Sequence, residues 1–260
     1  MPVPGPWRLW AALAVAGAAA AGLVGAGIAL HDHQGKPGDG DAGQALPVAV
    51  PAAVTAPRQN GPAPAYIATL SEPTPYGAAP GGTSTGTLAA TNPFGAPQVL
   101  ALIDSPDGSG WLHVELPVRP NGTTGWIPAR GVAISETFYR VAVSLAARTL
   151  TVTDAGRVVL TTPVGIGAQH TPTPPGDTYI WELVRPDDPG GAYGPYIFGL
   201  AEFSTAYSAF NGGDAQIGIH GQDKPGSIGQ AASNGCVRLP NDVVTQLAGL
   251  LPLGTPVSIA

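Results

Sequence analysis

Cys236 is the only cysteine among the 260 residues of the chain, and it lies 16 residues after His220. A catalytic cysteine needs a nearby base, because the thiolate is the nucleophilic form. Histidine suits this task, since its ordinary pKa lies near neutrality. A separation of 16 residues is too long for one helix face, but it fits a loop that leaves a strand and returns beside it. The spacing leaves two interpretations open: a Cys–His nucleophilic pair, or a buried cysteine and a hydrogen-bonded histidine.

The residues beside Cys236 favour acyl transfer. Gly235 removes a side chain next to the sulfur, so a substrate carbonyl can approach closely. The backbone N–H groups of Gly235 and Cys236 could then face a developing oxyanion. A single cysteine excludes an internal disulfide and a cysteine-based zinc site. A papain-like peptidase is disfavoured, because its cysteine lies near a helix start and its histidine far downstream.

The segment 217–240 reads IGIHGQDKPGSIGQAASNGCVRLP and resembles the signature of the L,D-transpeptidase catalytic domain, also called the YkuD domain. The family pattern is a histidine, then after a dozen or so residues Ser/Thr-x-Gly-Cys, often with an arginine two positions beyond the cysteine. The resemblance extends to TPTPPGDTYI, GPYIFGL and GTPVSI, so it covers residues 139–260. It implies a mostly β fold, a YkuD-like β-sandwich with one or two short helices.

The resemblance also implies a reaction. Cys236 would attack the carbonyl of the third residue in a peptidoglycan stem tetrapeptide, which releases D-alanine and leaves a thioester. The amine of a neighbouring stem would then attack the thioester and form a 3→3 cross-link. His220 would activate the thiol, and the backbone carbonyl of Gly221 would orient the imidazole. Carbapenems are expected inhibitors, and no metal or organic cofactor is implied. An L,D-carboxypeptidase with water as acceptor and a non-catalytic wall-binding scaffold are the alternatives.

Two side chains flank this predicted nucleophile. Asn234 stands where many family members carry a second histidine; an amide cannot act as a base, but it can donate a hydrogen bond near the oxyanion. Arg238 is expected to bind a stem carboxylate through its guanidinium fork. The alternative for Arg238 is an internal salt bridge with Asp214 or Asp242.

Three further residues are predicted to line the substrate site: Ser233, Tyr196 and Tyr179. For Ser233 the alternative is a structural hydrogen bond within the loop. For the two tyrosines the alternative is core packing. Residues 191–194 contain enough glycine to form a mobile flap over the site.

Short strands must position these residues. Apolar and β-branched runs predict a meander and then separate strands, at 139–145, 148–154, 157–164, 178–184, 196–200, 216–220 and 256–260. A short helix is predicted at 241–250, with Asn241 as its cap and Asp242 in its first turn. This catalytic domain is assigned residues 136–260.

Residues 66–135 predict a smaller β domain, with hairpin turn signals at Asp107-Gly108 and Asn121-Gly122. The stretch GWLHVELPVRPNGTTGWIP resembles bacterial SH3-like modules, which implies a small SH3-like β-barrel. Trp111 and Trp126 are assigned to the core rather than to ligand stacking.

The N-terminal residues indicate export. Residues 9–30 carry no charge, which predicts a signal-anchor or a cleaved signal peptide at 1–30, with a soluble helix as the alternative. Residues 31–65 are rich in Pro, Ala and Gly and predict a linker. Both export interpretations place the rest of the chain outside the cytoplasm, in the cell envelope. The net charge of −6 and the lack of a basic cluster exclude a nucleic-acid partner.

Overall fold

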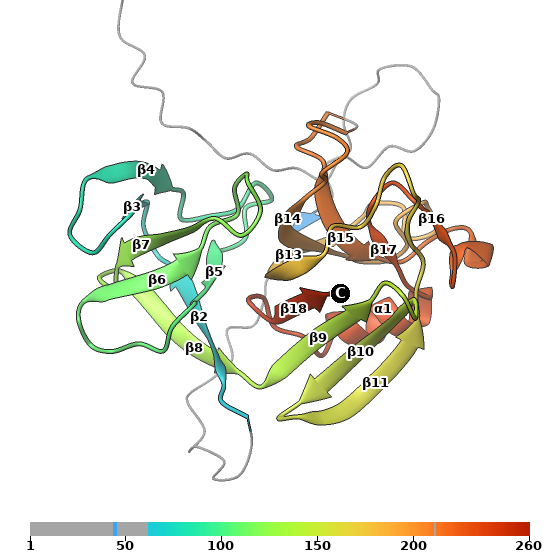
Figure 1. Ribbon diagram of the computed structural model, residues 1–260, viewed down its shortest axis with the longest axis horizontal. Helices are drawn as coiled ribbons and strands as arrows, with labels where there is room; N and C mark the ends of the chain where they lie inside the picture. The colour runs from blue at the N-terminus through green and yellow to red at the C-terminus, as the bar shows by residue number, and fades with distance from the viewer. Residues whose placement is uncertain (1–43, 46–61, 211) are drawn as a thin grey trace, which may run out of the picture.

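The computed structural model describes residues 44, 45, 62–210 and 212–260. Two β-rich units follow each other along this part of the chain, the N-terminal unit (residues 62–137) and the C-terminal unit (residues 138–260) (Figure 1). The predicted signal or anchor at 1–30 and most of the predicted linker lie outside the described residues. Within the described part, no helix has the length and apolarity needed to cross a bilayer.

The N-terminal unit consists of two small sheets. Their orders are β5-β2-β8 and β4-β3-β7-β6. The strands are β2 (Ala65–Leu70), β3 (Thr74–Gly77), β4 (Ser84–Leu88), β5 (Val99–Ala101), β6 (Trp111–Glu115), β7 (Thr124–Pro128) and β8 (Val132–Thr137). Leu112 and Val114 alternate with half-buried residues along β6 and point into a separate apolar core. The SH3-like identity of this unit stays a prediction.

The C-terminal unit is built on one long sheet, of order β11-β10-β9-β18-β13-β14-β15-β17. Its strands are β9 (Tyr139–Ser144), β10 (Thr149–Asp154), β11 (Arg157–Pro163), β13 (Gly176–Arg185), β14 (Ile197–Phe203), β15 (Gln216–His220), β17 (Val237–Arg238) and β18 (Pro256–Ile259). The predicted meander is confirmed: Ala155 and Gly156 adopt φ of 48° and 80° at its second turn, which hairpin turns require.

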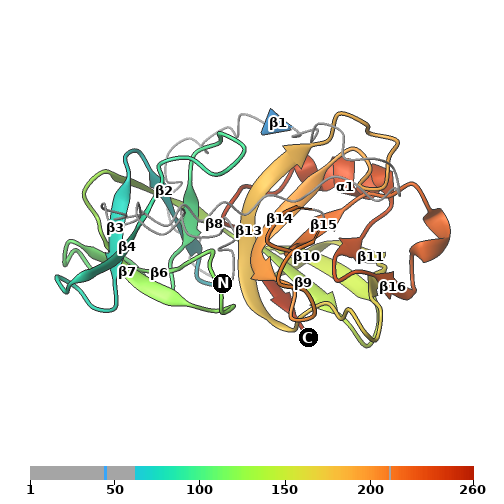
Figure 2. The ribbon, with the colours of Figure 1, turned by 90° about the horizontal axis from the view of Figure 1, so that it is seen from above.

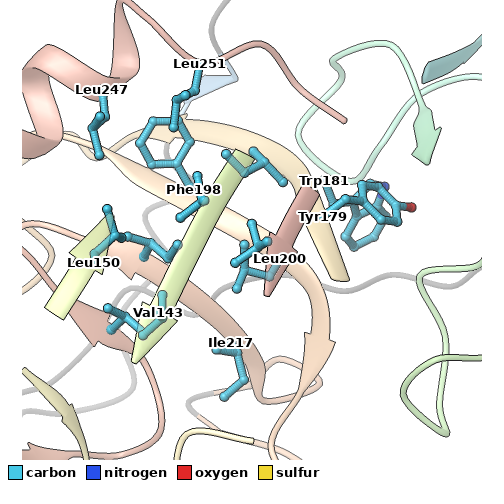
Figure 3. Packing of buried hydrophobic residues seen from close by; sticks show 14 of the residues in the cluster. Val143, Leu150, Tyr179, Trp181, Phe198, Leu200, Ile217, Leu247 and Leu251 are labelled. Atoms are coloured by element: carbon cyan, nitrogen blue, oxygen red, sulfur yellow. The ribbon is translucent and has the colours of Figure 1, made fainter. Parts of the chain in front are cut away.

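The sheet is curled, and the long strand β13 joins its two halves (Figure 2). β18 lies on one side of β13 and β14 on the other. Apolar residues from both halves pack into the main core, with Leu247 and Leu251 from the region of the helix (Figure 3). The prediction of a mostly β fold with one or two short helices is confirmed, since one α-helix, α1 (Asn241–Ala248), and one 3₁₀ turn, η1 (Pro225–Ser227), are present in the described residues.

Short pairings complete the unit around its loops. β12 (Ile166–Gly167) runs parallel to β16 (Ala231–Ser233) and ties the glycine- and proline-rich segment after β11 to the segment before Cys236. β1 (Gln44–Ala45) pairs with the end of β13. The β12–β16 pairing holds the chain before Cys236, and the β15–β17 pairing holds the chain after it.

Candidate active site

Strand pairing brings His220 and Cys236 together. β15 ends at His220 and runs parallel to β17, which begins directly after Cys236, with His220 opposite Arg238. The backbone N–H of Gly218 donates a hydrogen bond of 3.4 Å to Cys236 Sγ. Because side chains alternate along a strand, Gly218 and His220 share one face of β15. The sulfur therefore lies against β15 two residues before His220, at the edge of the strand that pairs with β17.

The ring of His220 is oriented by its own backbone neighbour. Nδ1 lies 2.5 Å from the carbonyl oxygen of Gly221. A carbonyl can only accept, so Nδ1 carries the proton and Nε2 is left as an acceptor. Burial lowers the pKa of His220 to about 4, with the positive charge of Arg238 acting in the same direction. The neutral, Nδ1-protonated imidazole is thus the form present at neutral pH.

The thiol of Cys236 is half-buried. Burial raises its pKa above the ordinary cysteine value, while the Gly218 hydrogen bond and the charge of Arg238 oppose that rise. At neutral pH the resting site therefore holds a neutral thiol beside a neutral base. Such a pair generates the nucleophile by proton transfer to Nε2 during attack, and not as a preformed ion pair.

A chain of hydrogen bonds fixes the loop before Cys236. Ser233 Oγ donates to the Cys236 carbonyl at 2.6 Å and accepts from the Gly235 N–H at 3.1 Å. Thr173 Oγ1 donates to the Gly235 carbonyl at 2.7 Å. Ser233 is only 3% exposed, so its predicted contact with substrate is wrong and the structural alternative holds. The predicted use of Gly235 as an oxyanion donor is also wrong here, because Ser233 already occupies its N–H.

Gly235 has a different function in this loop. Its φ of 123° lies in a region that L side chains rarely adopt, and a Cβ atom would come within 2.9 Å of Ile217 Cδ1. The backbone N–H that faces the sulfur belongs to Gly218. The sequence analysis did not single out Gly218.

Arg238 is half-buried, and its Nε is buried without a hydrogen-bond partner in the described part of the chain. Within the same residues it forms no ion pair with Asp214 or Asp242, the two alternatives that the sequence offered. A half-buried guanidinium with an unused donor is suited to an anionic ligand. Asn234, two residues before Cys236, is exposed.

Residues 138–259 match the family model described as YkuD: L,D-transpeptidase catalytic domain. These residues belong to the YkuD family. YkuD of Bacillus subtilis is 40% identical over 121 residues, which is 46% of this chain and 65% of that protein. The chain thus covers slightly less than two thirds of this curated relative.

Solved structures give the same family name at lower identity. A mutant of an Enterococcus faecium L,D-transpeptidase is 24% identical and covers 47% of this chain and 49% of its own, with a TM-score of 0.38. The LD transpeptidase LdtMt1 in complex with imipenem is 18% identical and covers 58% of this chain and 90% of its own, with a TM-score of 0.39. The family assignment rests on the sequence match.

Of the two tyrosines predicted to line the substrate site, Tyr179 is excluded by its burial, whereas the substrate contact of Tyr196 stays a prediction. Tyr179 is fully buried, and its hydroxyl points to the carbonyls of Val99 and Glu115 in the N-terminal unit, so its predicted substrate contact is wrong. Figure 3 shows Tyr179 and Trp181 to one side of the other labelled core residues. Tyr196 is half-buried against the main core, and its carbonyl accepts from the Gly221 N–H at 3.3 Å.

Two residues near His220 were missed in the YkuD domain. The ring of Tyr193 lies 4.9 Å from the ring of His220, tilted by 55°. Asn241 does not cap helix α1; instead its Oδ1 accepts a 2.7 Å hydrogen bond from the Gln222 N–H. Tyr193 lies within the glycine-rich segment 191–194, and that segment was the only sequence feature that indicated a position near the site. The sequence predicted that the Asn241 side chain would cap its own helix, but it bonds to the loop at Gln222 instead.

No group of three or more metal-ligating side chains is found among residues 44, 45, 62–210 and 212–260. The predicted site of the YkuD domain therefore consists of a thiol, an imidazole, a guanidinium and backbone groups.

Proposed function

We propose that the chain is a peptidoglycan L,D-transpeptidase that forms 3→3 cross-links through a thioester on Cys236. Cys236 Sγ attacks the carbonyl carbon of the third stem residue, and the C–N bond to the terminal D-alanine breaks. The amine of a second stem then attacks the thioester, and the sulfur leaves as the thiol. The observation that carries this proposal is the position of His220, whose ring is oriented by the Gly221 carbonyl, on the strand that pairs with the strand directly after Cys236.

His220 supplies the proton transfers of both steps. Nε2 takes the thiol proton as Sγ attacks, and the resulting imidazolium gives it to the departing D-alanine amine. In the second step Nε2 takes a proton from the attacking amine, and the sulfur is reprotonated. The Nδ1 bond to the Gly221 carbonyl holds the ring in position throughout. The Gly218 N–H favours the thiolate, because it already donates to the sulfur.

Arg238 supplies the charge that a stem peptide needs. Among the described residues the guanidinium Nε has no hydrogen-bond partner, and the positive charge acts on both Cys236 and His220. A stem carboxylate would pair with it, and this pairing would reduce the effect of Arg238 on the pKa of His220. Donor binding would thus make His220 a better base.

The full-length chain incubated with purified tetrapeptide stems tests the reaction. Mass spectrometry should resolve cross-linked dimers, released D-alanine and an acyl adduct on Cys236, and Cys236→Ala should form none of them while keeping the wild-type circular dichroism spectrum. Tripeptide alone, despite abundant acceptor amine, would show the L,D-carboxypeptidase instead. Absence of every product and adduct would favour the non-catalytic scaffold.

The same thiol is proposed to react with carbapenems. One solved relative is a complex with imipenem, and Cys236 in this chain lies beside a base and an N–H donor. Opening of the lactam C–N bond would leave the acyl group on Sγ. An intact-mass increase equal to one imipenem, absent in Cys236→Ala, is the expected result.

The proposed substrate lies in the cell envelope, so the proposed location is extracytoplasmic. The uncharged run at 9–30 is consistent with anchoring or secretion. Fractionation of cells expressing the full chain, with N-terminal sequencing of the recovered protein, separates an uncleaved anchor from a cleaved signal.

A further inference from the structure

The N-terminal unit places an aromatic side chain on the YkuD domain. Phe94 packs with Tyr193 on a small apolar cluster formed by Val184 and Ile197, both fully buried. Asn92 Oδ1 accepts from the Phe94 N–H at 3.1 Å and from the Ala96 N–H at 2.9 Å. These two bonds hold the loop that presents Phe94 in one conformation.

The two cluster residues under Phe94 lie directly across the sheet from His220, on neighbouring strands. Val184 is the register partner of Ile197, and Ile197 is the register partner of His220. Tyr193, which packs on the same two residues, also contacts the His220 ring. Phe94 and His220 are thus connected by packed side chains, through the cluster and through Tyr193.

A second contact holds the segment that leads into the His220 strand. Arg119 donates to the carbonyls of Ser204, Tyr207 and Asp214 at 2.8, 3.0 and 2.8 Å. Its guanidinium carbon also lies 5.1 Å from the centre of the Phe203 ring. One side chain of the N-terminal unit therefore joins three points of the connection between β14 and β15.

Asn121 extends the same contact to the strand itself. Its Nδ2 donates to the Phe203 carbonyl at 2.8 Å, and its Oδ1 accepts from the Phe203 N–H at 3.0 Å. This amide pair satisfies both backbone groups of Phe203, as a neighbouring strand would. Phe203 is in turn the register partner of Gln216, the first residue of β15. Asn121 also donates to the buried carboxyl of Glu202.

Apolar packing joins the units between these two contacts. Ile67 and Val99 of the N-terminal unit are members of the main core of the YkuD domain. Tyr179 closes the same interface with its hydroxyl on Val99. An independently moving wall-binding module on a linker would not share its core with the enzyme.

We infer that the N-terminal unit is a positioning element of the active site, which sets His220 through Phe94 and Tyr193 on one side and through Arg119 and Asn121 on the other. This inference rests on the proposed function of His220 as the base. It assigns the N-terminal unit a task in the reaction, besides any contact with the wall.

Phe94→Ala in the full-length chain tests the first contact. The readouts are the titration of the His220 ring by NMR, assigned with a His220→Gln variant, and the rate of cross-link formation. Water reaching the ring should raise the His220 pKa toward its ordinary value, and turnover should fall about 10-fold because the base is less well placed. Arg238, whose charge acts on this ring, and Tyr193, which contacts it, both remain in place in the variant.

Phe94→Leu keeps an apolar cover and should retain both wild-type values. Ile103→Ala, in the same unit and 48% exposed, is the matched control and should change neither readout. The inference is overturned if Phe94→Ala titrates and reacts as Ile103→Ala does. If Phe94→Ala does not fold, a Phe94→Leu variant that loses activity with an unchanged His220 titration also overturns it.

Arg119→Ala tests the second contact. Arg130→Ala is its matched control, because in the described part of the chain Arg130 forms only an exposed ion pair with Glu72 at 3.4 Å. Amide hydrogen exchange in β15 should rise at least about 10-fold in Arg119→Ala and stay unchanged in Arg130→Ala. Equal exchange in the two variants would overturn the inference. A wild-type chain that forms no cross-links would refute the proposed function alone, since titration and exchange do not depend on turnover.

Discussion

Asn241 Oδ1 accepts a 2.7 Å hydrogen bond from the backbone N–H of Gln222, two residues after His220. Gly194 and Gly221 pack so closely around this oxygen that a Cβ on either would come within 2.5 Å of it. The bond fixes the turn whose carbonyl, at Gly221, accepts from His220 Nδ1. The first residue of helix α1 thus determines the direction of the imidazole from outside the site.

Asn241→Ala should lower turnover between about 10-fold and 100-fold, because the Gly221 carbonyl loses its fixed direction and the base is misplaced. Asn241→Asp retains the acceptor oxygen and should recover most of the activity. The pH profile of kcat distinguishes positioning from simple destabilisation. Asp242→Ala, at the next and equally exposed position, is the control; a loss of the same size there would contradict the assignment.

Arg238→Lys should raise the KM for stem peptides by about 10-fold to 100-fold, since an ammonium keeps the charge but loses the planar fork. Steady-state kinetics on two stems, one with the recognised carboxylate free and one with it amidated, provide the measurement. The difference between wild type and variant should shrink on the amidated stem. Arg148→Lys, which loses only a bond to the Gly229 carbonyl, should match wild type on both.

Gly235→Ala should abolish acylation of Cys236, because alanine is strained at a φ of 123° and its Cβ meets Ile217. Iodoacetamide labelling and imipenem adduct formation, followed by intact mass, report on the thiol directly. Gly226→Ala is the control, as a Cβ there meets nothing within 4 Å. Wild-type adduct formation in Gly235→Ala would show that the loop tolerates a different backbone conformation.

The buried carboxyl of Glu182 should make the chain less stable as the pH rises. Burial raises its pKa to about 8, whereas the pKa of a glutamate in an unfolded chain is about 4.3. The folded state therefore binds more protons between these values, and the free energy of unfolding falls until about pH 8. The lowered pKa of His220 gives a slope of the opposite sign, which fades about one pH unit above the ordinary histidine pKa and is common to wild type and Glu182→Gln.

Thermal unfolding between about pH 6.5 and pH 8.5 measures the effect. The midpoint should fall with pH in wild type and fall less steeply in Glu182→Gln, which stays neutral. Glu115 and Glu202, whose pKa values burial raises to about 8 and about 7, leave a residual slope. The exposed Glu72→Gln is the control, and a wild-type slope identical to that of Glu182→Gln would contradict the prediction.

Local patterns in the sequence were sufficient for much of the fold. Apolar, β-branched runs and turn residues predicted the β9–β10–β11 meander, and β15 runs over the predicted residues 216–220. The spacing of His220 and Cys236 predicted a loop that returns beside its strand, as the β15–β17 pairing confirms, whereas the expected task of Arg238 came with the family resemblance. Asn241, by contrast, has the sequence features of a helix cap and forms a different bond.

Only the tertiary structure decided which partner each polar group took. Ser233 and Gly235 bond each other, Tyr179 faces the N-terminal unit, and Phe94 shares a cluster with Tyr193, a residue 99 positions later. The contacts of Tyr179 and Phe94 join residues far apart in the chain, so no local periodicity records them. Residue type fixed the available chemistry of this protein, whereas strand register and the docking of its two units decided where that chemistry is held.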